Sequence, residues 1–561
     1  MMSTRVLTSK KNNCKNCYKC IRYCPVKAIK FSDNQASIVE EECILCGKCY
    51  TVCPQSAKEV RNDIDIVKEM LAKGETVFAS IAPSFVANYD GANITSMTNA
   101  LKKLGFSGAE ETAVGATVVK REYDKMANEG KKDIIISSCC HSVNTLVQKY
   151  YPEALEYVAD ILSPMQAHCK KIKEKHHGSK TVFIGPCISK KDEADMYPGI
   201  TDAVLTFEEL DGWFSQAGIE IEKCEDEISG GKTRLFPTST GILKSMDCEN
   251  ADYTYIAVDG MDNCMAALED IKNGGMKNCF IEMSACSGSC VNGPAMSKKS
   301  YRYVKNTLAV NRYAAKEDFD VEQPKDISAL KKDIPFIGVR HTMPGSKAIE
   351  EILNRMGKTR PEQELNCGSC GYDTCREKAV AVLMGKANLE MCMPYLKDKA
   401  ESFSDNIIKN TPNGIIVLNE DYEVQQINAA AKQIMNIKSS DDVLGNPVVR
   451  ILDPSRFMQV LSTGHDIKNE RVYLADYDKY VEETIIYDKS YHIIINIMRD
   501  VTENELEHEK RLENTKNTIE ITDKVIDKQM RVVQEIASLL GETTAETKIA
   551  LTKLKENLSD E

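Results

Sequence analysis

The chain has 561 residues, of which 42% are hydrophobic and 28% are charged, as is usual for soluble globular proteins. With about 100–200 residues per domain, this length predicts several domains rather than one core. The formal net charge of -12 argues against a nucleic-acid partner, because phosphate binding needs a basic face. The sequence has no run of about 18 apolar residues and no start typical of a signal peptide, so we expect a cytoplasmic protein without a membrane partner.

Cysteine is the most informative residue type, since 22 cysteines in a reducing compartment indicate metal sites more than disulfides. Two N-terminal runs have the spacing C-x2-C-x2-C-x3-C-P of bacterial two-cluster ferredoxins, in which the fourth cysteine of each run binds the other cluster. The first predicted 4Fe-4S cluster is held by Cys14, Cys17, Cys20 and Cys53. The second is held by Cys43, Cys46, Cys49 and Cys24. Zinc is the alternative, because paired C-x2-C motifs also build zinc ribbons, but the duplicated run with both prolines favours clusters.

From about residue 75 the sequence alternates short apolar, β-rich runs with helical stretches, which predicts α/β units around a mostly parallel sheet. Four of these runs end in unusual residues: TVFASIAPS (76–84), DIIISSCC (133–140), TVFIGPC (181–187) and NCFIEMSAC (278–286). Ligands in open α/β sheets bind at the carboxyl ends of strands. We therefore expect these segments to converge on one site.

The segments SSCCHSV, GPCISKKDE and EMSACSGSCVNG resemble the three signature motifs of the FeFe-hydrogenase catalytic domain, in the same order. IAPS, LGFSGAEET and SPMQ fit intervening segments of that family over roughly residues 75–300. The resemblance implies an α/β domain with an H-cluster, which is a 4Fe-4S cubane bridged to a diiron subcluster with CO, CN and azadithiolate ligands. The alternative is a plain cubane, as in the hydrogenase-like assembly proteins.

The resemblance also implies a role for individual residues. The cubane of the H-cluster would be held by Cys140, Cys187, Cys286 and Cys290, the last of which would bridge to the diiron unit. Cys139 would pass protons, Lys190 would hydrogen-bond a cyanide, and Glu193 would hold that lysine. The pocket would be lined by Pro83, Ser84, Gly185, Ser284 and Met165. A plain cubane requires neither Cys139 nor Lys190.

Three pocket positions depart from the family pattern. Gly185 and Ser284 stand where methionines are usual, and Met165 stands where glutamine is usual. Such neighbours tune a metal site through hydrogen bonding and local dielectric, so we expect shifted potential and affinity with cofactor binding retained. These departures resemble those of the divergent hydrogenases that are considered sensory.

The proton route also departs from the family pattern. Tyr123 and Met126 occupy the positions of the glutamate pair that relays protons in efficient members. Glu122 and Asp124 lie nearby and are candidate substitutes. If no relay is intact, turnover should be slow, because proton transfer needs groups within hydrogen-bond reach of one another.

A separate set with the spacing C-x2-C-x4-C-x16-C is formed by Cys367, Cys370, Cys375 and Cys392. Its surroundings resemble the small four-cysteine iron-sulfur domain of membrane electron-transfer subunits and corrinoid proteins, which implies a third 4Fe-4S cluster. The glycines allow tight folding around a cube, and CREKAVAVLMG predicts a helix that returns the chain to the fourth cysteine. Zinc is again the alternative.

Residues 403–501 resemble a PAS domain, from the strand-turn-strand NGIIVLNED and the helix INAAA to a closing DVTE that leads into a helix. Such pockets hold haem or flavin in some proteins, and His465 or His492 would be the candidate haem ligand. A lone histidine is more often a surface or core residue.

After this segment, apolar residues recur every seven positions, which predicts a coiled-coil seam and a homodimer. The seam is formed by Leu512, Ile519, Ile526, Val533 and Leu540. The alternative is a helix packed on its own PAS domain. Because the sequence stops at Glu561, we expect the output to be a separate partner, such as a phosphatase or kinase effector, or the tail to be a docking surface.

The predicted fold class is multidomain α/β and α+β. The expected domains are a ferredoxin-like two-cluster domain (1–62), an FeFe-hydrogenase-like α/β H-cluster domain (63–310), a linker with a helix (311–358), a four-cysteine domain (359–397), a PAS domain (398–502) and a helical coiled-coil tail (503–561).

This organisation favours a hydrogen sensor with low reversible H2 oxidation and proton reduction, which relays its redox state to the PAS and coiled-coil module. The expected partners are H2 and protons, a ferredoxin-like electron partner and the hydrogenase maturation proteins. One alternative is an ordinary ferredoxin-dependent catalytic hydrogenase, which would need neither a PAS domain nor a coiled coil. The other is a cubane-only electron-transfer or assembly scaffold.

Overall fold

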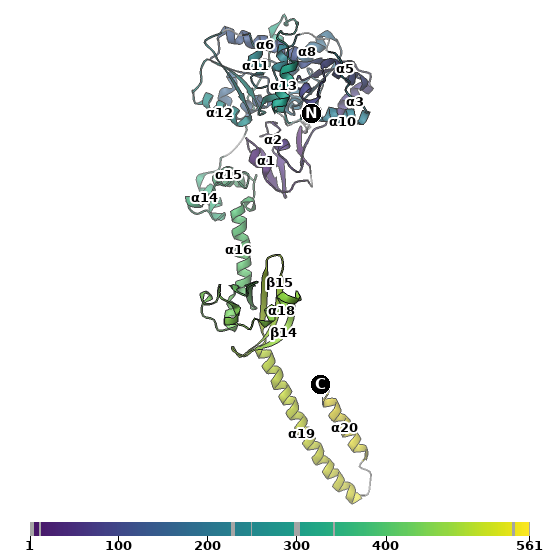
Figure 1. The fold of residues 1–561 in the computed structure, drawn as a ribbon, viewed down its shortest axis with the longest axis vertical. Helices are drawn as coiled ribbons and strands as arrows, with labels where there is room; N and C mark the ends of the chain where they lie inside the picture. Colours follow the sequence, from purple (N-terminus) through teal and green to yellow (C-terminus); the bar gives the residue numbers. More distant parts are fainter. Residues whose placement is uncertain are drawn as a thin grey trace. The chain divides into compact units, whose positions relative to one another are not determined.

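The computed structural model describes residues 5–10, 13–225, 230–247, 250–296, 303–339, 343–540 and 545–559. The chain divides into two compact units, Met1–Tyr395 and Leu396–Glu561. The ribbon is traced in Figure 1. Among the described helices, none combines the length and the apolar character that a membrane span requires.

The N-terminal domain consists of two antiparallel strand pairs and two short helices. Strand β1 pairs with β4, and β2 forms a hairpin with β3. The bounds are β1 (Leu7–Ser9), α1 (Lys19–Tyr23), β2 (Ile29–Ser32), β3 (Gln35–Ile38), α2 (Lys48–Thr51) and β4 (Lys58–Val60). Helix α1 carries Cys20 and α2 carries Cys49, so each cysteine run contributes its third thiol from a helical turn.

The central domain contains two parallel sheets, where the sequence predicted one. One sheet has the strand order β6-β5-β8-β9 and the other β10-β11-β7. The bounds are β5 (Val77–Ile81), β6 (Gly108–Glu111), β7 (Ile134–Ile136), β8 (Lys180–Gly185), β9 (Ala203–Thr206), β10 (Thr254–Asp259) and β11 (Cys279–Ser284). All pairs are parallel, as the alternation of strands and helices predicted. The alternation does not specify which strands become neighbours, so the division into two sheets was not predictable from it.

Helices pack on these sheets and bury them. One core joins the first sheet to α5 and α10, and a second joins β7 and β11 to α7 and α12. Val77, Ile81 and Ile184 have no exposed surface, as expected for parallel strands that are covered on both faces. The bounds are α3 (Ile64–Ala72), α4 (Phe85–Asn88), α5 (Ile94–Lys103), α6 (Thr112–Glu129), α7 (His141–Tyr150), α8 (Pro164–Lys175), α9 (Ser189–Met196), α10 (Phe207–Ala217), α11 (Gly241–Ser245), α12 (Met261–Lys272) and α13 (Tyr303–Tyr313).

The four-cysteine domain is helical. Its helices are α14 (Ser346–Arg355) and α15 (Cys375–Leu383), and α16 (Met393–Asn410) begins directly after Cys392. The predicted helix between the third and fourth cysteines is confirmed as α15. Its N-cap is Thr374, whose hydroxyl accepts a hydrogen bond from the Glu377 backbone N–H.

The second unit contains a five-stranded antiparallel sheet with the order β13-β12-β16-β15-β14. The bounds are β12 (Gly414–Asn419), β13 (Val424–Ile427), α17 (Ala429–Ile434), α18 (Ser455–Thr463), β14 (Ile467–Leu474), β15 (Lys479–Asp488) and β16 (Ile493–Asp500). Ile416 and Leu418 are buried on one face and alternate with partly exposed residues, the pattern of a sheet with one covered face. The predicted strand-turn-strand and the helix at INAAA are confirmed as β12, β13 and α17.

The tail is a helical hairpin. Helix α19 (Thr502–Leu540) follows β16 almost directly, and α20 (Ala545–Ser559) packs against it, with a Lys555–Asp523 ion pair of 3.1 Å. Of the predicted seam, Leu512 is exposed and Ile519, Ile526 and Val533 are half-buried; the side chain of Leu540 lies outside the described residues. A second segment of the same chain therefore lies along α19, and a coiled coil between two chains stays a prediction.

Candidate active site and cluster ligands

The eight N-terminal cysteines form two groups, and in each group the fourth cysteine comes from the other sequence run. The pKa of Cys20 is raised by burial, opposed by Lys58, and raised further by the thiols of Cys14, Cys17 and Cys53. The pKa of Cys49 is raised by burial and by the thiols of Cys46, Cys43 and Cys24. These neighbourhoods match the two predicted ligand sets. No three His, Cys, Asp or Glu side chains of the described residues are grouped closely enough to hold a single metal ion.

The three central motifs converge at the carboxyl ends of β7, β8 and β11. The Cys140 thiol accepts a hydrogen bond from the Ala285 backbone N–H at 3.5 Å, which joins the first motif to the third. The Ala295 N–H donates to the Pro186 carbonyl at 3.0 Å, which joins the third motif to the second. Burial raises the pKa of Cys286, and its sulfur neighbours are Cys290, Cys187, Cys140 and Cys46. Four predicted cubane ligands from three distant segments therefore lie together.

The loop of the second N-terminal set lies against this group. Cys46 and Cys286 line one cavity of about 530 Å³. Gly47 has a positive φ of 72°, and a Cβ there would come within 2.6 Å of Pro294. Glycine at this position thus allows close approach between the two cysteine sets.

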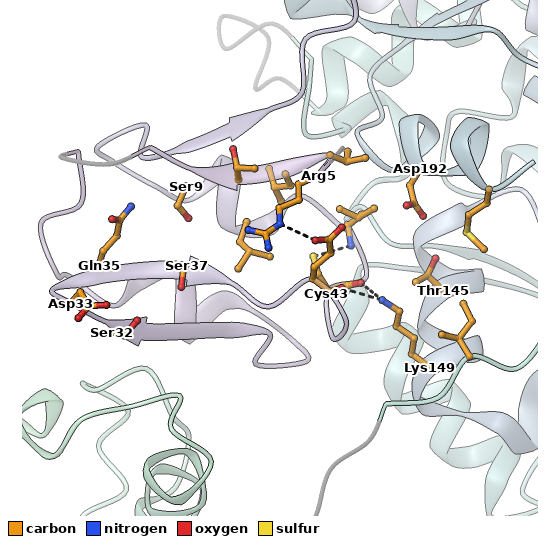
Figure 2. A pocket seen from close by; sticks show the side chains of 18 residues that line it. Arg5, Ser9, Ser32, Asp33, Gln35, Ser37, Cys43, Thr145, Lys149 and Asp192 are labelled. Atoms are coloured by element: carbon orange, nitrogen blue, oxygen red, sulfur yellow. Dashed lines mark hydrogen bonds and ion pairs between the residues drawn. The ribbon is translucent and has the colours of Figure 1, made fainter. Parts of the chain in front are cut away.

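A second cavity, of about 510 Å³, lies at the same junction of domains (Figure 2). Arg5 pairs with Glu40 at 3.0 Å, and the Lys149 ammonium donates to the Cys43 carbonyl at 2.8 Å. Lys149 belongs to α7, which begins directly after Cys140. One helix therefore connects the cysteine loop of the central domain to that of the N-terminal domain.

A buried charge cluster surrounds the predicted cyanide-binding lysine. Lys190 donates to the Cys139 carbonyl at 3.0 Å and is ion-paired with Glu193, which also accepts a hydrogen bond from Ser163 Oγ at 3.0 Å. Burial alone would raise the pKa of Glu193, but Lys190 and Lys332 outweigh it and hold that pKa below its usual value. Glu193 therefore stays ionised and fixes Lys190. Lys332, which sequence reasoning did not identify, is paired with the other carboxylate oxygen.

Cys139 lies beside Tyr123, one of the two replacements in the family's proton relay. The Tyr123 hydroxyl lies 3.2 Å from the Cys139 sulfur and 3.1 Å from Ser138 Oγ, and it accepts a hydrogen bond from the Ser138 N–H at 2.9 Å. Burial raises the pKa of Cys139 to about 12, while the Tyr123 hydrogen bond and Lys190 oppose the rise. The thiol is thus the protonated form at neutral pH.

The two expected substitute carboxylates do not reach Cys139. Glu122 accepts a hydrogen bond from the Gln323 side chain at 2.8 Å, and Asp124 accepts one from the Asp247 N–H at 3.0 Å. Residues 122 and 124 flank Tyr123 on α6, and the 3.6-residue helical period turns them away from its face. The expectation that they replace the glutamate pair is therefore not supported by this geometry.

Glu282 is the acidic residue that sequence reasoning missed. It lies on β11 and its carboxylate accepts hydrogen bonds from the Ile242 and Leu243 N–H groups at 3.0 and 3.1 Å. Burial raises its pKa to about 7, and its charge acts on Cys139. The sequence feature that could have pointed to Glu282 is its position as the one charged residue in the largely apolar run NCFIEMSAC.

The predicted pocket residues lie beside the cysteine motifs. Pro83 and Ser84 follow β5, whose end pairs with the end of β8 next to Gly185. Ser84 Oγ is buried and has no hydrogen-bond partner among the described residues. A buried polar atom without a partner is rare in folded proteins, and it fits a site that takes a further polar group.

Packing explains in part why three pocket positions differ from the family pattern. A Cβ at Gly185 would lie 2.8 Å from the Phe183 ring and 3.1 Å from Ala82, so a methionine cannot occupy this position without rearrangement. Met165 is buried in the core of the first sheet, and Ser284 is 8% exposed. Gln166, the next residue after Met165, has a buried amide nitrogen without a partner among the described residues.

The third cysteine set also lies together. Its members Cys367, Cys370, Cys375 and Cys392 line one small pocket. Lys378 of α15 is buried, and its ammonium donates to the Asn388 carbonyl at 2.6 Å. Burial lowers the pKa of Lys378 to about 8, while the thiols of Cys370 and Cys392 oppose this effect. Lys358 lines the same pocket, so two lysines lie beside the set.

The two histidines of the second unit lie at the surface. His465 is exposed, and His492 is paired with Glu420 at 3.0 Å with 70% of its side chain exposed. A haem ligand would have to face the interior, so the alternative interpretation as surface histidines holds.

Comparison with known proteins assigns these regions to families. Residues 75–294 match the C-terminal domain of the large chain of iron-only hydrogenases, residues 7–66 a 4Fe-4S dicluster domain and residues 363–394 an Fe-S cluster domain. Iron hydrogenase 1 of Clostridium pasteurianum is 27% identical over 438 residues, which are 63% of this chain and 75% of that protein.

Two solved structures are also similar to parts of the chain. An [FeFe]-hydrogenase from Chlamydomonas reinhardtii has 17% identity and a TM-score of 0.41, with 50% of this chain and 100% of that chain covered. The PAS domain of an HTR-like protein from Haloarcula marismortui has 20% identity and a TM-score of 0.16, with 19% and 94% covered. On the family matches, the chain contains the C-terminal domain of the iron-only hydrogenase large subunit, together with a 4Fe-4S dicluster domain and a four-cysteine Fe-S domain.

Proposed function

We propose that this chain is a hydrogen-sensing FeFe-hydrogenase of low turnover, which passes its redox state to a C-terminal PAS and helical module. The observation that carries the proposal is the arrangement around Cys139. Its thiol and the Lys190 ammonium lie beside the convergent cysteines, and Glu193 holds the lysine. A plain cubane needs neither group, so this arrangement disfavours the cubane-only scaffold.

The residues fit an H-cluster. Its cubane would be held by Cys140, Cys187, Cys286 and Cys290, and the pocket offers the buried Ser84 hydroxyl and the Lys190 ammonium as donors. Both donors suit CO and CN ligands, and the Lys190 ammonium would make the stronger hydrogen bond because it is ionised. When bound, the diiron group supplies the site at which two protons and two electrons combine reversibly to H2.

The protein would supply protons through a route that differs from the family's glutamate pair. Cys139 holds a proton next to the site, and the Tyr123 hydroxyl is its hydrogen-bond neighbour at 3.2 Å. Glu282, with a pKa of about 7, is the group suited to gain and lose that proton near neutral pH. A route through a buried tyrosine and one carboxyl agrees with slow turnover, which suits a sensor.

Electrons would enter and leave through the dicluster domain, from a ferredoxin-like partner. The second cluster would be nearest the H-cluster, because Cys46 neighbours Cys286. Together with the third cysteine set, the chain would hold three 4Fe-4S clusters besides the H-cluster. Loading of the diiron unit would require the hydrogenase maturation proteins.

The second unit would provide the readout. Its five-stranded antiparallel sheet, with helices α17 and α18, fits the predicted PAS domain, and α19 starts directly after its last strand. Apolar side chains of the tail remain exposed, among them Leu512, Val525 and Ile536. We propose that they pair two chains in the cytoplasm and present a surface to a phosphatase or kinase effector.

The test is infrared spectroscopy of the matured full chain, combined with dye-coupled hydrogen turnover. Bands of iron-bound CO and CN with slow turnover would support the sensor. Fast turnover with the same bands would favour an ordinary ferredoxin-dependent hydrogenase. Absence of those bands from iron-loaded, matured protein would contradict both and leave the cubane-only scaffold.

A further inference from the structure

The four-cysteine domain lies directly against helix α1 of the dicluster domain. Arg22 donates from Nε to the Gly368 carbonyl at 3.2 Å and from Nη2 to the Ser369 carbonyl at 3.0 Å. Lys27 donates to the Gly371 carbonyl at 3.2 Å. Two cations of the dicluster domain thus hold the loop between the first two cysteines of the third set and the residue after them.

Ion pairs and a backbone contact extend this interface. Lys27 is paired with Asp373 at 3.2 Å, and Lys386 is paired with the largely buried Glu42. The Phe31 N–H of strand β2 donates to the Lys386 carbonyl at 2.8 Å. Contacts from α1, β2 and the loop before Cys43 thereby fix the domain at several separate points.

Close packing at the centre depends on one glycine. Gly371 has a φ of 95°, and a Cβ there would lie 3.0 Å from the Ile21 Cβ and 3.2 Å from the Arg22 nitrogen. Ile21 lies between Cys20 and Cys24, which belong to different N-terminal sets. The third set therefore packs on the helix that serves both predicted clusters of the dicluster domain.

The cysteines of the two domains share one buried core. It contains Cys20, Cys24, Cys49 and Cys370 together with Ile21 and Tyr372. Tyr372 is 3% exposed, and its hydroxyl has no hydrogen-bond partner among the described residues. Tyr372 thus packs in the same core as Cys370 of the third set and Cys24 of the dicluster domain.

We propose that the four-cysteine domain is an internal electron-transfer partner docked on α1, so that the third cluster exchanges electrons with the dicluster clusters across the Cys370–Tyr372–Cys24 contact. The step moves one electron: the donor cluster is oxidised, the third cluster is reduced, and no bond or proton changes place. Cys392 directly precedes α16, which leads into the second unit, so this branch links the H-cluster domain to the signalling module. The proposal rests on the proposed function only in that all three sets hold cubanes.

The test uses the full chain with its cubanes reconstituted and reduced, and measures magnetic broadening of the third cluster's paramagnetic resonance signal by its neighbours. A Cys367→Ser variant identifies that signal by its loss. The broadening should be present in the parent and lost in the double variant Arg22→Glu, Lys27→Glu. It should persist in Lys10→Glu, Lys30→Glu, a control with the same change of charge at exposed positions of the same domain.

A rescue and a cross-link complete the test. The exchange Lys27→Glu, Asp373→Lys keeps Arg22 and restores an ion pair of reversed polarity, so it should retain the broadening. A zero-length carbodiimide should join Lys27 to Asp373 in the unsubstituted protein, which needs no variant to fold. A third cluster without broadening in the parent, or the absence of that cross-link from iron-loaded protein, would overturn the docking.

The two proposals fail separately. Matured protein that lacks CO and CN bands but shows the broadening and the cross-link would refute the proposed function and leave the docking intact. Normal CO and CN bands beside a magnetically isolated third cluster would refute the docking alone.

Discussion

Replacing Glu282 with glutamine removes one titrating group and leaves the surrounding backbone contacts in place. The glutamine amide oxygen still accepts from the Ile242 and Leu243 N–H groups, which the carboxylate accepts at 3.0 and 3.1 Å. The pKa of Glu282 lies at about 7 against an ordinary 4.5 because the carboxyl is buried. At about 1.36 kcal/mol per pH unit, this difference corresponds to about 3 kcal/mol in favour of the protonated carboxyl.

The sign of the pH dependence follows from that difference. In the folded chain the carboxyl is protonated below pH 7, whereas in the unfolded chain it is ionised above about pH 4.5. The free energy of unfolding should therefore fall as pH rises from about 4.5 to about 7, by about 3 kcal/mol, and then level off. This part of the pH dependence should be missing in the Glu282→Gln variant.

The assay of the proton route is dye-coupled turnover of matured protein between pH 5 and 9. Hydrogen oxidation needs an ionised acceptor and should rise through about pH 7, and proton reduction should fall through the same pH. In Glu282→Gln the rise of the oxidation rate and the fall of the reduction rate near pH 7 should both disappear. Both rates should drop by about 10²-fold or more. If the variant has normal infrared bands but unchanged turnover rates and an unchanged pH dependence, Glu282 does not belong to the proton route.

Three further predictions concern other positions. Tyr123→Phe removes the hydroxyl next to Cys139 and should slow turnover by at least about tenfold with the infrared bands unchanged, whereas an unaltered rate would exclude the tyrosine from the route. Lys332→Met leaves Glu193 with one of its two ammonium partners and should cost about 1–3 kcal/mol of unfolding free energy, measured by denaturant titration at pH 7; a cost near zero would contradict the buried pair. Cys392→Ser should remove the iron of one cubane, by iron analysis, and keep the CO and CN bands; loss of those bands would contradict an independent third cluster.

The local sequence determined the elements that depend on spacing. The repeated C-x2-C-x2-C-x3-C-P run predicted two cysteine groups with exchanged fourth members, and the thiols of Cys20 and Cys49 have those neighbours. Strand ends with cysteines predicted a shared site, because parallel strands present their carboxyl ends at one edge. The helix between Cys375 and Cys392 followed from the apolar, alanine-rich run after the third cysteine.

Only the tertiary structure decided which distant groups meet. The hydrophobic pattern indicated strands and helices, but it placed no limit on which strands pair, so the split into two sheets was not anticipated. Glu122 and Asp124 were chosen for nearness in sequence, whereas the carboxylates that act on Cys139 are Glu282 of β11 and Glu193 of α9, which lie far from it along the chain. The docking of Gly371 on Ile21 joins segments about 350 residues apart. Spacing fixes what a segment can bind, whereas packing between segments fixes what lies beside it, because side-chain contacts depend on the fold of the whole unit.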